Sequence, residues 1–289
     1  MRMNLGSKGW VPQGYQRLGR LEARGWCDLT VARQPETGEL CVVRRPQAAY
    51  ARAMELQAQW QAESVSVMKH ALHPGLLRLL DHGQQSGALF TVQELFVGES
   101  LEVLLSGRLG GLPERAACAL AVRVAEVLAH LHLHRWVHGA VHPGHVLLSS
   151  DGRVALLSPG KHRLWAGQRA ALGNQAAGND ALTVAFQPPV ELLGQTASDV
   201  WALAALLRSL LQGSELSPVP TSEPVQRLLR QMMEPPSLAI GEALAQLRAV
   251  VEPMPRLDVL AMRLAAEAPK RPVADLLAQL KLSEPGPRG

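Results

Sequence analysis

The sequence is poor in cysteine and lysine, and each shortage excludes a class of protein. Three cysteines occur among 289 residues, and Cys27, Cys41 and Cys118 show no paired spacing. This excludes a disulfide-stapled secreted domain and favours a reducing compartment. Most of the 29 basic residues are arginine, and they form no basic stripe, so binding to nucleic acid is not predicted.

Long hydrophobic runs and a signal core are also missing. No run of eighteen apolar residues occurs, so no membrane span is predicted. Residues 1–7 lack the apolar core of a signal peptide, and we therefore expect a cytoplasmic protein. What is present, 47% hydrophobic and 19% charged residues with a net charge of +4, is typical of a globular domain.

Short apolar runs in the first third of the chain predict strands. Residues 29–32 and 40–43 are apolar and flank residues 35–38, which read Pro-Glu-Thr-Gly, a hairpin turn signal. Residues 76–80 and 89–96 predict two further strands. Before them, residues 46–72 are rich in Ala, Gln and Glu at helical spacing, which predicts one helix.

The remainder of the chain is predicted to be mainly helical. Residues 113–133 carry an apolar stripe at helical spacing, and residues 198–211 predict a helix with Ser198 as its N-cap. Residues 97–100 predict a connector, residues 147–157 two short strands around an Asp-Gly turn, and residues 158–188 a long loop. This order predicts an α+β fold of two lobes with a cleft between them.

The expected N-lobe is a small antiparallel sheet plus one helix, and the expected C-lobe is larger and mainly helical. We expect a loose leader over 1–13, the N-lobe over 14–95, the C-lobe over 96–282 and a tail over 283–289. Residues 244–248 are echoed at 277–281, an offset of 33 residues. We interpret the echo as two similar helix-turn-helix units of one lobe, because two units are too few for a stable repeat array.

Residues 138–148 read His-Gly-Ala-Val-His-Pro-Gly-His-Val-Leu-Leu. They resemble the catalytic loop of the protein kinase family, HRDxKPxNVLL, and the resemblance extends over about residues 15–282. It implies a two-lobed protein kinase-like fold. The bacterial Ser/Thr protein kinases look most similar, by the compact length and the HGxxxP pattern of the loop.

The resemblance implies that the residues of phosphoryl transfer are replaced. Ala140 stands at the position of the general base, and a methyl group accepts no proton. His145 stands at the position of a Mg²⁺-binding Asn, and Ser158 at the position of the DFG Asp, so oxygen ligands for the metal are lost. Arg44 replaces the Lys of the segment that resembles VAIK, which keeps the charge with a different geometry.

The resemblance also implies that the nucleotide cleft of the family is altered in this chain. The segment that resembles the Gly-rich loop has other residues at the three glycine positions, Arg24 among them, so close approach of backbone to phosphate is lost. Glu63 resembles the partner of the VAIK lysine, a surface-facing Glu63 being the other interpretation. The vestigial cleft is expected to comprise Arg24, Arg44, Glu63, Gln93 at the gatekeeper position and Glu94 at the hinge.

Residues with structural roles in the family are retained. His138 matches the histidine that braces the catalytic loop, and Asp199 matches the residue that holds the backbone of this loop. Glu191 resembles the Glu of the APE motif, and Arg271 resembles its ion-pair partner. The resemblance therefore predicts a buried pair between Glu191 and Arg271.

These replacements predict a pseudokinase, a catalytically inactive regulator or scaffold that acts through contacts with protein partners rather than as an enzyme. No cofactor is expected, and nucleotide binding is not favoured. One alternative is a metal-independent nucleotide-sensing switch, in which Arg24, Arg44 and Lys161 offset phosphate charge. Another is an atypical ATP-binding transferase with His142 or His145 as its base.

Histidines crowd residues 130–145 and raise the question of a metal site. His130 and His134 share a helix face, but no cluster of cysteines or carboxylates joins them, so no metal site is predicted. The loop from 158 to 191 has no tyrosine, and Gly139 replaces the arginine that docks a phosphorylated loop. We expect no control by phosphorylation there; a binding surface and a disordered connector both stay open.

Overall fold

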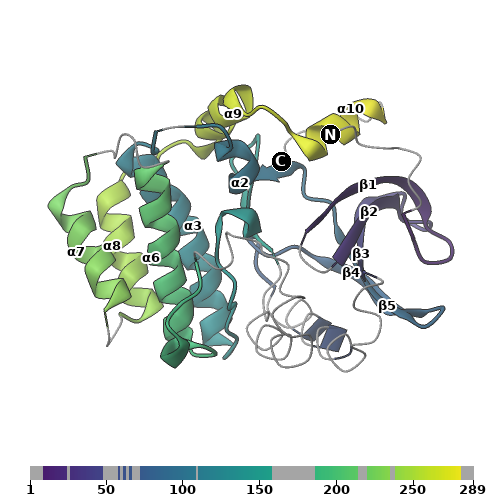
Figure 1. The fold of residues 1–289 in the computed structure, drawn as a ribbon, viewed down its shortest axis with the longest axis horizontal. Coiled ribbons are helices and arrows are strands. Elements are labelled where there is room, and N and C mark those ends of the chain that lie inside the picture. The colour runs from purple at the N-terminus through teal and green to yellow at the C-terminus, as the bar shows by residue number, and fades with distance from the viewer. Residues whose placement is uncertain are drawn as a thin grey trace.

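The computed structural model describes residues 9–24, 27–47, 58, 61–62, 65–66, 72–108, 110–157, 186–213, 220–234 and 238–280, without the side chains of residues 22–24 and 88. These residues form a small lobe built on a sheet and a larger, mainly helical lobe (Figure 1). The predicted two-lobed α+β arrangement is confirmed. The predicted helix over 46–72 lies largely outside the described residues, although the positions described within 58–66 are helical.

The small lobe is an antiparallel sheet in the strand order β1-β2-β3-β5-β4. Its strands are β1 (Gln16–Arg24), β2 (Cys27–Arg33), β3 (Leu40–Pro46), β4 (Leu79–Gln85) and β5 (Ala88–Glu94). The predicted β2–β3 turn is confirmed, with the Gln34 N–H donated to the Glu39 carbonyl at 2.9 Å. β4 begins at Leu79 rather than residue 76 and runs on through polar residues, because an edge strand needs apolar side chains on one face only.

Strand alternation gives this sheet two apolar faces, and both are covered. One face carries the cluster Ala32, Cys41, Val43, Phe90 and Val92. On the other face, Val31 and Val42 pack with Leu276 from the C-terminal part of the chain. The sheet therefore needs two separate segments to bury its hydrophobic side chains.

Residues 9–13, predicted as part of a loose leader, instead cover the first of these faces. The Trp10 ring lies 5.6 Å from the Phe90 ring, and the Arg45 guanidinium lies 4.8 Å from the Trp10 centroid. Tyr15 donates its hydroxyl to Asp81 at 3.0 Å, which ties the same segment to β4. The correction has a simple cause, since a large aromatic side chain gains more free energy from packing than from solvent exposure.

The large lobe is built around α3 (Glu114–Leu133). It packs against α6 (Thr196–Gln212) and α8 (Ile240–Val251), with α7 (Glu223–Met233) completing the group. Within the described residues, α3 is the one helix long and apolar enough to cross a membrane by length and composition. Most of its apolar window, 61%, is buried inside the lobe, which is the behaviour of a core helix.

Two element boundaries differ from the predictions. Ser198 does not cap α6, which begins at Thr196; its hydroxyl donates to the Gln195 carbonyl at 2.7 Å, inside the first turn. The predicted connector over 97–100 contains a strand, β6 (Gly98–Ser100), which pairs with β7 (Val146–Ser149). The predicted hairpin is confirmed as β7 and β8 (Val154–Leu156), with Gly152 at φ +83° in its turn.

The last two helices, α9 and α10, pack against different parts of the molecule. α9 (Leu257–Glu267) lies against α2 (Leu101–Leu105) and α3 in the large lobe. α10 (Pro272–Gln279) crosses to the small lobe and packs beside β1 and β6 (Figure 1). The echoed residues 244–248 lie in α8, and residues 277–279 of their counterpart lie in α10, which contacts β6 as well as the sheet of the small lobe.

Candidate functional site

Asp199 holds the backbone of the loop over residues 138–145. Its Oδ2 accepts the backbone N–H of His138 at 2.8 Å, and its Oδ1 accepts the N–H of Gly139 at 2.7 Å. The His132 Nε2 lies 2.9 Å from the same carboxylate and donates to it. Asp199 is fully buried, so these three donors replace the water that its charge loses on folding.

His138 fastens the loop to the end of β8. Its Nε2 donates to the Leu157 carbonyl at 2.8 Å, since a carbonyl oxygen only accepts, and its Nδ1 accepts the Ala140 N–H at 3.2 Å. The side chain is fully buried. The loop backbone is therefore fixed from both sides by Asp199 and His138, two of the four residues for which the sequence predicted structural roles.

Ala140 lies in this loop between His138 and His142, and its side chain offers no proton acceptor. The residue is buried, with 8% of its surface exposed. The His145 Nδ1 donates to the Ala140 carbonyl at 2.7 Å, which orients the imidazole by a backbone contact. The neutral ring then keeps its lone pair on Nε2, and imidazole is a poor ligand for Mg²⁺.

His142 stacks on His145, with ring centroids 3.9 Å apart. The His142 Nδ1 accepts the N–H of Gly144 at 3.2 Å and so begins the short helix η2 (Pro143–His145). The centroid of the Phe186 ring lies 6.5 Å from that of His142. Packing and a backbone contact thus account for a buried pair of histidines in the loop.

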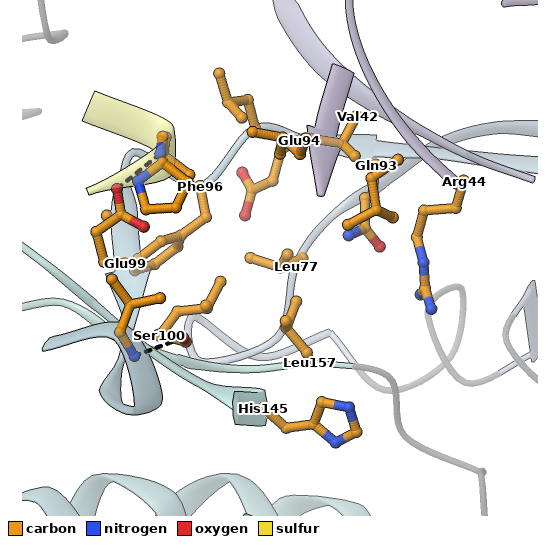
Figure 2. A pocket seen from close by; sticks show the side chains of 18 residues that line it. Val42, Arg44, Leu77, Gln93, Glu94, Phe96, Glu99, Ser100, His145 and Leu157 are labelled. Atoms are coloured by element: carbon orange, nitrogen blue, oxygen red, sulfur yellow. Dashed lines mark hydrogen bonds between the residues drawn. The ribbon is translucent and has the colours of Figure 1, made fainter. Parts of the chain in front are cut away.

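A cavity of about 140 Å³ lies between the lobes, next to this loop. Figure 2 shows Val42 on one side and Leu157 on the opposite side, with Phe96 at one end and Arg44 at the other. Four residues singled out in the sequence line it together: Arg44, Gln93, Glu94 and His145. Arg44 and Gln93 are buried, at 6% and 4% exposure, so the polar groups stand in largely apolar walls.

Other residues predicted for the cleft lie beyond the described part of the chain. These are Glu63, Ser158 and the side chain of Arg24. The same holds for Lys161 and for residues 158–185 of the predicted loop. The site described here therefore consists of the sheet wall, the hinge and the loop over residues 138–145.

The structure adds Arg153, which sequence reasoning missed. Its Nη2 donates to Glu94 Oε1 at 2.8 Å, its Nε donates to the Pro74 carbonyl at 3.1 Å, and its guanidinium lies 5.2 Å from the Phe96 ring centroid. Arg153 thus ties the β7–β8 hairpin to the hinge over residues 95–97. Nothing near it in sequence signals this role, because all three partners are distant along the chain.

The predicted buried ion pair between Glu191 and Arg271 is wrong. Both residues are exposed, and no ion pair of the described residues joins them. Glu191 lies in η4 (Val190–Leu192) beside α6. Arg271 directly precedes α10, which packs beside β1 and β6. The physical reason is the burial of Leu276, which draws the segment after α9 away from Glu191.

His130, near the end of α3, contacts the rings of His73 and of His134, the residue that follows the helix. The His130 ring lies 5.1 Å from His73 and 4.6 Å from His134. Burial and the neighbouring ring lower the pKa of both His73 and His130 below the ordinary value. In the described part of the chain, no three residues of the His, Cys, Asp and Glu types are placed to hold a metal ion.

An antiparallel sheet lobe, a helical lobe, a cavity at the hinge and a loop fixed by a buried aspartate define a protein kinase-like fold. The protein kinase domain model matches residues 30–282. The chain belongs to the protein kinase family.

Relatives and solved structures agree with this assignment. Serine/threonine-protein kinase D2 of Rattus norvegicus is 29% identical over 157 residues, which is 52% of this chain and 17% of that protein. The 3-phosphoinositide-dependent protein kinase 1 of Arabidopsis thaliana is 26% identical over 191 residues, 63% of this chain and 38% of that protein. The chain thus spans less than half of either relative.

The PknI kinase domain of Mycobacterium tuberculosis superposes with a TM-score of 0.63 and 19% identity. The superposition covers 88% of this chain and 99% of that domain. At this identity the likeness concerns the fold, and it extends across both lobes.

Proposed function

We propose that this chain is a catalytically inactive member of the protein kinase family that acts as a regulatory or scaffolding protein through contacts with other proteins. The carrying observation is Ala140, a buried methyl group in a loop whose backbone is held by Asp199 and His138. The loop keeps its bracing contacts and lacks the acceptor that a phosphoryl transfer from ATP to a hydroxyl requires. His145 adds to the argument, because an imidazole nitrogen is a poor ligand for Mg²⁺, which prefers oxygen ligands.

The proposal is tested by following transfer from labelled ATP to the chain itself and to a general protein substrate, with Mg²⁺ or Mn²⁺. We expect no transfer and no phosphate release above the level of the His142→Ala variant. Metal-dependent turnover that disappears in His142→Ala would instead establish the atypical transferase. In a strain that lacks the chain, His142→Ala should restore function as fully as the wild type, because contacts rather than loop chemistry carry the role.

The second candidate is a metal-independent nucleotide switch, favoured by the Arg44 guanidinium at the cavity wall. Calorimetric titration with ATP, once with Mg²⁺ and once with EDTA, separates the candidates. The regulatory proposal expects no heat in either case. Equal binding in both would support the switch, and binding that needs Mg²⁺ would contradict both, because the positions of the metal ligands are replaced.

A further inference from the structure

α9 is apolar on two opposite sides, and one of these sides faces solvent. Its inner side packs into the core of the large lobe through Leu257, Ala261 and Leu264, which are buried. On its outer side, Val259 and Met262 are 48% and 55% exposed. A helix that is apolar all round is normally buried all round, so a solvent-facing apolar side indicates a surface that another molecule covers.

α7 shows how a helix of the same length in this chain meets solvent. Both helices have 11 residues and lie at the outside of the large lobe (Figure 1). The middle and last turns of α7 expose Gln226, Arg227, Arg230 and Gln231, all of them polar. At the offset of 33 residues found in the sequence, Gln226 corresponds to Val259. The apolar outer side is therefore a property of α9 and not of every outer helix.

The exposed apolar side chains of α9 have the spacing of a helix-pairing surface. Val259, Met262 and Ala266 are all exposed and recur after three and four residues, which places them in one line along the helix; we call them the outer stripe. Met262 has a flexible thioether that adapts to the shape of a partner. The outer stripe is about 10 Å long, so it fits roughly two turns of another helix and supports a weak, reversible contact.

Arginines border the outer stripe along one side. Arg256 and Arg263 are seven residues apart, at the same place in successive heptads, and both are exposed. Asp258 pairs with Arg256 at 2.5 Å, and Glu267 pairs with Arg263 at 3.2 Å and also with Arg108. The two carboxylates of α9 are thus already engaged by three arginines, which leaves an excess of positive charge beside the outer stripe.

We propose that the outer stripe of α9 docks an acidic amphipathic helix of a protein partner. The apolar side of that helix packs on Val259 and Met262, and its carboxylates face Arg256 and Arg263. Residues 254–271 carry four cations and two carboxylates, so an acidic helix is attracted and a basic helix is repelled. The proposal rests on the proposed function and deepens it, because it names the surface and the chemistry of the contact through which an inactive chain acts.

The charge preference is tested with two fluorescein-labelled peptides of about 21 residues, each with leucine at the a and d positions of its heptads. One peptide carries glutamate at the e and g positions and the other carries lysine, so like charges keep either peptide from pairing with itself. Fluorescence anisotropy with the full chain at low salt measures the dissociation constants. We expect the glutamate peptide to bind roughly tenfold more tightly than the lysine peptide. Equal affinities, or no binding of the glutamate peptide, would overturn the proposal.

Substitutions on α9 and α7 show whether the peptide binds at the outer stripe. Met262→Asp places a charge in the stripe and should weaken binding of the glutamate peptide by roughly tenfold. Gln226→Asp places the same charge at an exposed position of α7 and should leave the affinity unchanged. Arg263→Glu should shift the preference toward the lysine peptide. An equal loss in Met262→Asp and Gln226→Asp, or an unaltered preference in Arg263→Glu, would place binding elsewhere.

Two other occupants of this face are separate outcomes. Cosedimentation of the chain with phosphatidylserine vesicles that is lost in Met262→Asp would assign the outer stripe to an anionic membrane surface. Self-association in sedimentation experiments that is lost in the same variant would assign it to a second copy of the chain. Either result would contradict an acidic helix of a protein partner as the occupant.

These results are separable from the proposed function. Turnover of MgATP would contradict catalytic inactivity whatever the peptides do. In a strain that lacks the chain, Met262→Asp should fail to restore function, whereas Gln226→Asp should restore it. Full restoration by Met262→Asp would exclude the outer stripe as the docking face and leave the inactivity of the loop untouched.

Discussion

Asp199, in α6, holds the backbone of the loop that contains Ala140. Asp199 fixes the backbone through two N–H donors, and this task does not depend on the side chain at position 140. Ala140 is buried and small, so it fits the loop without any polar group that must be satisfied. The shape of the loop therefore does not depend on a polar side chain at position 140.

Two buried thiols make the stability of the chain sensitive to high pH. Burial, with a smaller contribution from Glu39, raises the pKa of Cys41 to about 11. Burial, with a smaller contribution from Glu114, raises the pKa of Cys118 to about 12. Both thiols therefore stay protonated in the folded chain under conditions in which the unfolded chain releases these protons.

We predict that the free energy of unfolding falls as the pH rises from about 9 to 11. An unfolded thiol has a pKa of roughly 8.5, so above this pH the unfolded state binds fewer protons than the folded state and gains stability relative to it. Urea denaturation across this range measures the slope. Cys118→Ala should flatten it, whereas Val122→Ala, a truncation of another buried α3 side chain without a titrating group, should not. Equal slopes in both variants would contradict the assignment.

At the scale of elements, the β7–β8 turn contacts α9 so closely that a side chain does not fit. Gly152 has φ +83°, and a Cβ there would lie 2.6 Å from the backbone N of Asp258, at the start of α9. Gly38 in the β2–β3 turn has φ +71° with no heavy atom within 4 Å of such a Cβ. A comparison of substitutions at Gly38 and Gly152 therefore separates the cost of backbone strain from the cost of a steric clash with α9.

We predict that Gly152→Ala destabilises the chain by about 1–3 kcal/mol more than Gly38→Ala. Both variants place a Cβ at a positive φ, and this steric strain costs roughly 1–2 kcal/mol. Only Gly152→Ala must also push α9 away from the turn. Chemical denaturation with an unchanged m-value gives the comparison, and equal losses would show that the turn and α9 are not in firm contact.

The elements that the sequence predicted well are those whose signals are local. The 35–38 turn and the apolar stripe of α3 each follow from neighbouring residues, and both are confirmed. The cap of α6 was misplaced because Ser198 satisfies its own helix turn instead of the helix end. The path of α10 could not be predicted, because the partners of Leu276 lie at the opposite end of the sequence.

The same distinction between local signals and long-range contacts applies to the site. The motif positions led to Ala140, His145 and Gln93, which the structure places at the cleft or in its loop. The roles of Glu99 and Arg153 were not predicted. Glu99 caps α10 and Arg153 joins the β7–β8 hairpin to the hinge, and both contacts form only when the chain folds. Single side chains that join distant segments leave no pattern of spacing to detect.

At the scale of the whole molecule, Arg153 of the large lobe binds Glu94 of the small lobe and so links the two lobes. It contacts Glu94 at the end of β5, the Pro74 carbonyl and the Phe96 ring. Its planar guanidinium meets all three partners in different directions, which a lysine ammonium on a flexible stem does not do. Arg153 therefore adds a side-chain contact from the large lobe to the backbone pairings that hold the hinge.

We predict that Arg153→Ala and Arg153→Lys both speed amide hydrogen exchange in residues 94–98. Arg78→Ala serves as the control, because Arg78 pairs with Glu39 at 2.9 Å on the exposed surface of the small lobe. An exposed pair contributes little, so this variant should leave exchange at the hinge unchanged. Hinge exchange that is the same in all three variants would show that the backbone pairing of β6 and β7 suffices without Arg153.

The burial of Leu276 against Val31 and Val42 also sets an order of events during synthesis. A ribosome makes the strands of the small lobe before the large lobe, and α10 only after most of the large lobe. At about 5–20 residues per second, the intervening chain takes roughly 12 to 50 seconds to appear. Throughout this interval the cleft-side face of the sheet lacks its final cover, and an exposed apolar strand surface is a site at which nascent chains associate wrongly or recruit chaperones. The small lobe therefore completes its core only after the large lobe has been translated.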